Sequence, residues 1–249
     1  MTDEFKSERL GTISTHWSLV RRAHGGPDDV AESARRQLLE RYGGAVRRYL
    51  QKVVGDPHAA DDVFQEFALR LVRGDLCGAT PERGRYRNFV KGVLFHLIAD
   101  HRLHQWRWPR LLPAESVGAT GESGHVEFDR QFLESWREEL LARGWAALAL
   151  ADAESGQSFY AVLRFRADHP EMRSHEMAEA LTARFGESFS SAGVRQLLHR
   201  ARGKFAKILL DEVRASLENP PPDQLEEELV DLGLLEYCRP TLGRAALRC

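Results

Sequence analysis

The stretch ADDVFQEFALRL, Ala60 to Leu71, has the spacing of an amphipathic helix and decides how the chain around it is interpreted. Its apolar side chains recur every three or four residues, which is the period of one helix face. They are Val63, Phe64, Phe67, Ala68 and Leu71. The polar side chains of Asp62, Gln65 and Glu66 share the opposite face. The stretch therefore predicts a helix that is buried on one side and carries carboxylates on the other.

Signals for helix ends flank this stretch. Gly55-Asp56-Pro57 separates two helices, because Asp is a good N-cap and Pro is favoured at the first helical position. We expect one helix at 31–54 and the next at 58–73, ending at Gly74. A third helix is expected at 86–106, where an apolar face runs from Phe89 to Ile98. Three helices with such faces predict a compact bundle.

The remainder of the chain predicts an all-α fold of two small helical domains. Apolar and polar residues do not alternate convincingly and β-branched residues do not cluster, so no strand is expected. Helices are expected at 128–151 and 157–168, followed by a helix–turn–helix unit at 174–217. Residues 111–127 lose the helical period and are expected to be a flexible linker. The predicted domains are 1–110 and 128–217, with one acidic tail helix (about 223–235) within 218–249.

Charge is sorted along the chain although the total is nearly neutral. The 249 residues include 35 Lys and Arg and 37 Asp and Glu, a formal charge of −2. Lys and Arg concentrate at 82–110 and 190–208, and the second of these stretches contains no acid. The charged residues of 218–236 are all acidic. Two basic stretches on separate helical units indicate a polyanionic partner.

Composition excludes several other classes of protein. The longest apolar run, 145–151, is too short to span a bilayer, so no membrane partner is expected. The polar N-terminus is not typical of a targeting segment, and three cysteines without CxxC spacing indicate no disulfide framework. We therefore expect a cytoplasmic protein. No GxSxG or phosphate-binding loop is present, and we expect neither an enzyme nor a cofactor.

The expected third helix combines cations with aromatic rings. Cations hold a phosphate backbone while aromatic faces stack on exposed bases, a combination that suits single-stranded or locally opened DNA. Solvated arginines beside ordinary core aromatics are the alternative explanation. The candidate residues are Arg85, Arg87, Lys91, Phe95, Arg102, Trp106 and Arg107.

The helix–turn–helix unit predicts a second nucleic-acid surface. Ser174 and Ser191 are the expected N-caps of its two helices. Early residues of the second helix would reach base edges in the major groove, and later cations would hold phosphates. A generic helical hairpin is the alternative. The outward-facing candidates are Arg195, Gln196, His199, Arg200, Arg202 and Lys204.

One pattern is typical of an enzyme. His96, Asp100 and His104 lie at i, i+4 and i+8 on one helix face and could hold a metal ion. No matching ligand motif is visible elsewhere in the chain. A metal-dependent hydrolase is therefore a minor alternative, and no metal site is predicted.

These segments together resemble a bacterial RNA polymerase sigma factor of the sigma-70 family, extracytoplasmic-function (ECF) type. Residues 60–71 resemble its region 2.2, usually written A-E-D-L-x-Q-E-x-F. GRYRNFVKGVLFHLIADHR, 84–102, resembles regions 2.3 and 2.4, and AGVRQLLHRARGKF, 192–205, resembles region 4.2. THWSLV (15–20) and LGLLEYC (232–238) resemble a Planctomycetes-like branch.

The resemblance implies a role for each surface. Asp62, Gln65 and Glu66 would dock on the β′ clamp helices of core RNA polymerase, with the β subunit as a further contact. Residues between Arg85 and Arg107 would bind and help to open the −10 element of promoter DNA, and those from Arg195 to Lys204 would bind the −35 element. An anti-sigma factor or another regulator is a further expected partner. The runner-up is a helix–turn–helix regulator that binds duplex DNA without polymerase.

Overall fold

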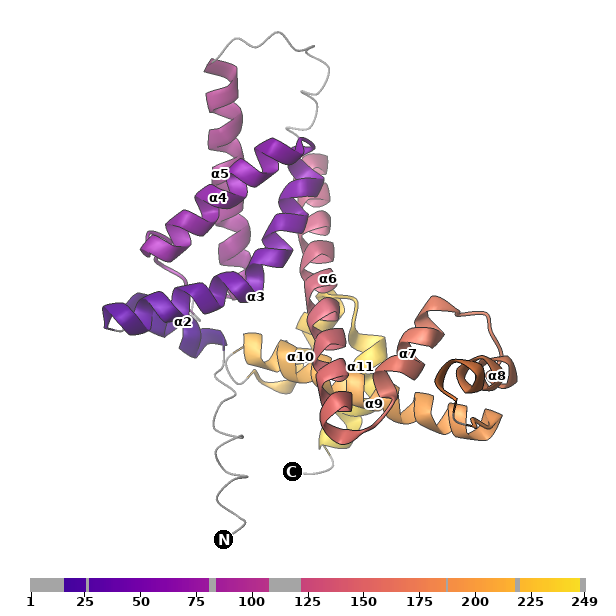
Figure 1. The fold of residues 1–249 in the computed structure, drawn as a ribbon. Helices are drawn as coiled ribbons and strands as arrows, with labels where there is room; N and C mark the ends of the chain where they lie inside the picture. The colour runs from indigo at the N-terminus through magenta and orange to yellow at the C-terminus, as the bar shows by residue number, and fades with distance from the viewer. Residues whose placement is uncertain are drawn as a thin grey trace. The chain divides into compact units, whose positions relative to one another are not determined.

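The computed structural model describes residues 16–25, 27–80, 84–107, 122–186, 188–217 and 220–246. Within these ranges the regular structure consists of helices without strands, which confirms the all-α prediction (Figure 1). In chain order they are α2 (His16–Gly25), α3 (Asp28–Val54), α4 (Pro57–Arg73), α5 (Tyr86–Arg107), α6 (Glu122–Ser155), α7 (Phe159–Asp168), α8 (Ser174–Phe185), α9 (Ser191–Ser216), α10 (Pro222–Asp231) and α11 (Leu235–Ala246).

Contacts divide the chain into two compact units. Unit 1 takes its described residues from 1–139 and 213–232, and unit 2 takes its described residues from 140–212 and 233–249. Helices α6 and α9 thus contribute to both units, whereas α10 belongs to unit 1 and α11 to unit 2. The functional division into 1–110 and 128–217 stays a prediction.

Helix α4 is delimited as its sequence predicts. The Asp56 carboxylate accepts a hydrogen bond from the backbone N–H of His58 at 2.9 Å, and Pro57 is the first helical residue. Gly74 ends the helix at a φ of 85°, a left-handed conformation that glycine adopts without strain. These two caps fix which residues of α4 face the core and which face solvent.

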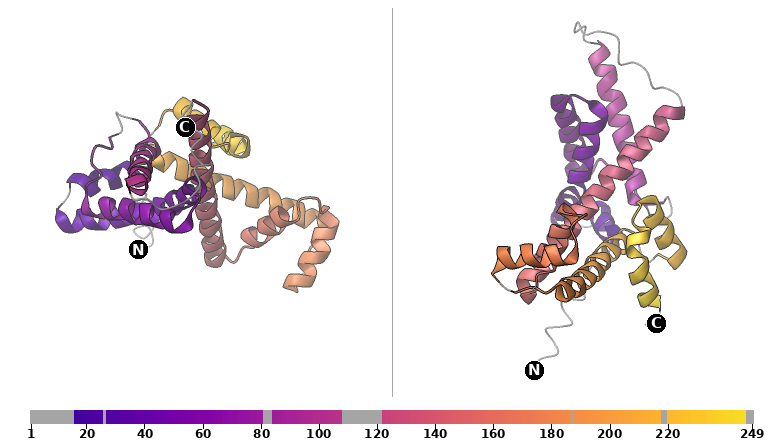
Figure 2. Two further views of the ribbon diagram at one scale, coloured as in Figure 1. Left: turned by 90° about the horizontal axis from the view of Figure 1, so that it is seen from above. Right: turned by 90° about the vertical axis from the view of Figure 1, so that its right-hand side faces the viewer.

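The core of unit 1 is a bundle in which α3 packs against α2 and α4, and α4 packs against α5 (Figure 2). Most of the buried stripe predicted for each helix is confirmed, although Phe64, Ala68 and Phe89 are only half-buried. Leu38 and Leu50 of α3, Val63 and Phe67 of α4 and Leu94 of α5 are at most 2% exposed. The first part of α6 completes this core, because Trp136 stacks on Tyr42 with ring centroids 4.9 Å apart. The bundle therefore holds α4 and α5 rigidly beside each other.

Unit 2 contains the predicted pair α8 and α9, which residues 186–190 join. Met177, Leu181, Val194 and Leu198 of this pair are buried. The predicted N-caps were wrong. The Ser190 hydroxyl, rather than that of Ser191, accepts from the Gly193 backbone N–H.

Helix α8 has a different cap from the expected Ser174, which is its first helical residue. The Glu176 carboxylate folds back and accepts from the Arg173 backbone N–H at 2.6 Å. At the other end of α8, Phe185 is 42% exposed.

Helix α6 begins at Glu122, six residues before the expected start at 128, so residues 122–127 are helical rather than linker. The Glu127 carboxylate accepts from Arg130 Nε at 2.9 Å and from Gln131 Nε2 at 2.7 Å. These contacts, three and four residues apart, stabilise the first turns of the helix. The rest of the predicted linker, up to 121, lies outside the described residues.

The acidic tail is two helices rather than one. α10 ends at Asp231, and Gly233, with a φ of 64°, turns the chain into α11. The left-handed backbone at Gly233 ends the expected helix over 223–235 early. Leu225, Leu229 and Leu232 form the buried face of this tail segment.

The structure bears on the predictions about disulfides and about membrane-spanning segments. Cys77 is exposed and Cys238 is buried, and both are free thiols. Of the helices that the structure describes, none is both long and apolar enough to cross a membrane.

Candidate functional site

The predicted carboxylate face lies on the solvent side of α4. Asp62 and Gln65 are exposed, and Glu66 is partly exposed. Glu66 accepts a hydrogen bond from Nε of Arg70, one turn further along, at 2.6 Å. The period of α4 thus places the three side chains where sequence reasoning put them.

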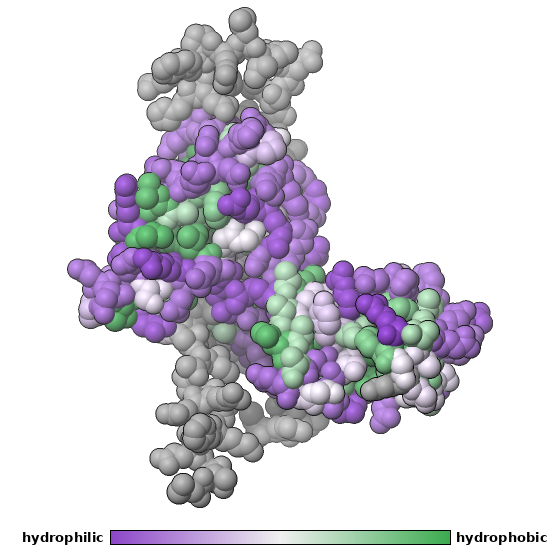
Figure 3. Space-filling model, in the orientation of Figure 1, coloured by the Kyte–Doolittle hydropathy of each residue, from purple (hydrophilic) through white to green (hydrophobic). Residues whose placement is uncertain are grey.

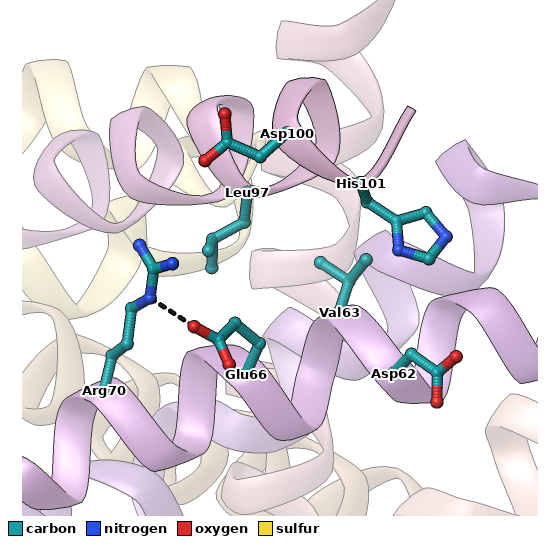
Figure 4. Close-up of a pocket in the computed structure, with 7 residues that line it drawn as sticks. All are labelled: Asp62, Val63, Glu66, Arg70, Leu97, Asp100 and His101. Atoms are coloured by element: carbon teal, nitrogen blue, oxygen red, sulfur yellow. Dashed lines mark hydrogen bonds and ion pairs between the residues drawn. The ribbon is translucent and has the colours of Figure 1, made fainter. Parts of the chain in front are cut away.

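Asp62 and Glu66 line a shallow pocket between α4 and α5 (Figure 4). Its volume is about 220 Å³. Its apolar lining is Val63 and Leu97, and Asp100 from α5 adds a third carboxylate. Arg70 and His101 complete it. An apolar floor with carboxylates around it is suited to the cationic side chains of a partner helix, whose stems pack on the floor while their charges meet the rim.

Apolar side chains are also exposed on α4 and α5. Leu69 of α4 is 43% exposed and Phe95 of α5 is 46% exposed. Figure 3 shows apolar surface where these two helices lie, surrounded by hydrophilic residues. The ring of Phe95, a candidate for stacking on bases, is therefore accessible.

The cations of α5 are engaged to different extents. Nζ of Lys91 lies 2.9 Å from Oδ1 of Asp129. Arg102 is exposed, with its guanidinium 5.9 Å from the centroid of the Phe128 ring. Trp106 and Arg107 belong to the last turn of α5, but their side chains lie outside the described residues.

Arg85 and Arg87 differ from the expected outward-facing cations, because carboxylates of α10 bind them. The Arg87 guanidinium donates from Nε and Nη2 to the two carboxylate oxygens of Glu228, both at 2.9 Å. Arg85 Nε lies 2.8 Å from Glu228 Oε2, and Asp231 pairs with both arginines. Arg87 is only 6% exposed and Glu228 only 2%. Arg87, a candidate DNA contact, is thus covered in this structure by a partner 141 residues away in the sequence.

Sequence reasoning missed Glu228, although one signal was present. Glu228 lies three residues after Leu225 and four before Leu232, in the middle of the buried stripe of α10. A carboxylate at an apolar position of a helix requires a cationic partner, because an unpaired buried charge is costly. The spacing therefore indicated a partner without identifying it.

The second candidate surface lies on α9 in unit 2. The predicted outward orientation of its six candidate residues is confirmed, since each of these side chains is exposed. Arg195, His199 and Arg202 are spaced i, i+4 and i+7 and form one row. Arg200, in the neighbouring row, places its guanidinium 5.1 Å from the centroid of the Phe159 ring. The other exposed members are Gln196 and Lys204.

The possible metal ligands gain no support from the described side chains. No group of three or more His, Cys, Asp or Glu residues is placed to hold a metal ion in the described part of the chain. His96 and Asp100 are exposed, and the side chain of His104 lies outside the described residues.

One segment of the chain is similar to a known protein family. Residues 38–107 match the family model for Sigma-70 region 2. No match is found among curated proteins or among solved structures. The matched segment covers most of α3 and all of α4 and α5, and so includes the pocket and every candidate residue on those helices. Over these residues the chain is therefore similar to region 2 of sigma-70 family sigma factors.

Proposed function

We propose that the protein is an ECF-type sigma factor, which binds core RNA polymerase, directs it to a set of promoters and helps to open the DNA. In this role it performs no catalysis and works in the cytoplasm, where the polymerase is. The observation that carries the proposal is the carboxylate-rimmed pocket of α4 and α5, which lies within the segment that matches Sigma-70 region 2.

The docking step uses the outer face of α4. Asp62 and Glu66 would meet cations of the β′ clamp helices, and Gln65 would add a neutral hydrogen-bonding group beside them. Arg70 holds Glu66 in place by a charge-assisted hydrogen bond. Complementary charge of this kind sets the rate and the specificity of docking.

The two DNA surfaces would bind different elements of the promoter. On α5, the accessible Phe95 would stack on an unpaired base of the −10 element while Arg102 holds phosphate. On α9, Arg195 and Gln196 near the start of the helix are suited to guanine and adenine edges of the −35 element. His199, Arg200, Arg202 and Lys204 follow along the same helix as phosphate contacts.

Run-off transcription with purified core RNA polymerase and a genomic promoter library tests this function. We expect the full chain to yield transcripts from a limited set of fragments that share two sequence elements at a fixed spacing. Core polymerase without the chain is the control. DNA binding without any chain-dependent transcript would favour the helix–turn–helix regulator instead.

A further inference from the structure

An ion-pair cluster joins the start of α5 to α10 within unit 1. Its centre is Glu228. The Glu228 carboxylate accepts hydrogen bonds from Nε and Nη2 of Arg87 and forms an ion pair with Nε of Arg85. Around it, Asp231 pairs with both arginines, and Glu227 Oε2 lies 3.7 Å from Arg85. Three carboxylates of one helix thus converge on two arginines.

The cluster excludes other ligands from Arg87. Glu228 and Arg87 are both nearly inaccessible to solvent, so a second anion has no route to this guanidinium while α10 is in place. Burial alone would raise the pKa of Asp231, but hydrogen bonds from Arg85 and Arg87 outweigh it and lower that pKa. The aspartate is therefore held in its charged form.

Carboxylate and phosphate groups bind an arginine side chain with the same geometry. Both are anions that accept two parallel N–H bonds from one guanidinium fork. Helix α10 brings the carboxylates of Glu227, Glu228 and Asp231 to these arginines, where they occupy the positions that phosphate oxygens would take. Arg85 and Arg87, which the sequence indicates as phosphate-binding residues, are the two cations that it covers.

We propose that α10 is an internal competitor of nucleic acid, which occupies Arg85 and Arg87 until the backbone of a DNA strand displaces it. The proposal rests on the proposed function, because the strand that displaces α10 is that of the opened promoter. In the chain without DNA, α10 covers Arg85 and Arg87. DNA binding by unit 1 therefore requires release of α10 from these arginines.

The test measures binding of the full chain to a fluorescein-labelled single-stranded oligonucleotide by fluorescence anisotropy over a range of salt concentrations. We expect the variant Glu228→Gln/Asp231→Asn to bind about tenfold more tightly at low salt than the unmodified chain. Its plot of log affinity against log salt should also be steeper by about 1.4, because each new phosphate contact on a single strand contributes about 0.7.

The matched control is Asp223→Asn/Glu226→Gln. It removes two charges from the same helix, at exposed positions that no ion pair of the described structure joins to Arg85 or Arg87. Its salt slope should equal that of the unmodified chain. Equal slopes for all three proteins, or equal changes in both variants, would show that α10 only braces the bundle and would overturn the proposal.

Two further variants distinguish the proposed effect from a loss of fold. Asp231→Asn alone changes a partly exposed residue and should shift affinity and slope in the same direction by a smaller amount. Adding Arg85→Ala/Arg87→Ala to Glu228→Gln/Asp231→Asn should abolish the gain, which loss of a structural brace would not do. A gain that survives without the two arginines contradicts the proposal.

Run-off transcription with core polymerase separates the two hypotheses. Transcripts from the unmodified chain together with an unchanged salt slope in Glu228→Gln/Asp231→Asn would refute the competitor and leave the proposed function standing. A steeper slope with no chain-dependent transcript from any variant would refute the proposed function and leave the masking of Arg85 and Arg87 in place.

Discussion

Replacing Asp62 and Glu66 together with lysine should lower the affinity of the chain for core RNA polymerase by about 100-fold, which corresponds to about 2.7 kcal/mol. Both side chains rim the pocket between α4 and α5, and lysines there would bring like charges against a basic partner surface. Titrating a fluorescently labelled chain with core polymerase measures the effect. The fold should survive, because lysine is a good helix former and both positions face solvent or the pocket rim.

A control variant reverses charge elsewhere in unit 1. Asp29 and Glu32 are exposed acids near the start of α3 and do not line the pocket. Changing both to lysine alters the net charge by the same amount and should change the affinity less than about threefold, since distant surface charges are screened by salt. If both variants lose affinity equally, the pocket has no specific role in docking.

Arg87→Met should lower the free energy of unfolding of unit 1 by about 3 kcal/mol, because it leaves the buried Glu228 without its main partner. The methionine fills a similar volume, so the cost is that of a buried carboxylate left with Arg85 as its remaining partner rather than of a cavity. Urea titration followed by tryptophan fluorescence measures the change, since Trp17 and Trp136 are buried in unit 1.

The double variant Arg87→Met/Glu228→Leu separates charge from packing. Replacing both partners of a buried ion pair with apolar residues is often neutral or stabilising, so we expect a loss below about 1 kcal/mol. The single and double variants together give the coupling between the two side chains. A double variant as unstable as Arg87→Met alone would mean that packing around Arg87, and not its charge, holds α10 in place.

The helices of the bundle are predictable from local signals. The Asp56 cap, Pro57 and Gly74 delimit α4 in the sequence as they do in the structure. The period of three and four residues correctly separates buried Val63 and Phe67 from the outer carboxylates. Such features depend on neighbours within one or two turns, and these are visible in the sequence.

The features that could not be predicted depend on partners distant in sequence. Arg87 has the pattern of an exposed cation, and only the packing of α10 against α5 buries it. Helix α6 starts at Glu122 although Gly124 is a poor helix former, and the contacts of Glu127 with Arg130 and Gln131 support the turn that follows. The pocket likewise joins Asp62 to Asp100, which the sequence places on separate helices.

The central claim is that the carboxylate face of α4 binds core RNA polymerase. Gel filtration of the unmodified full chain mixed with core polymerase at low ionic strength tests it most directly. The account predicts that the two co-elute at equal stoichiometry, and that Asp62→Lys/Glu66→Lys elutes separately under the same conditions. If the unmodified chain elutes apart from the polymerase, the account is contradicted.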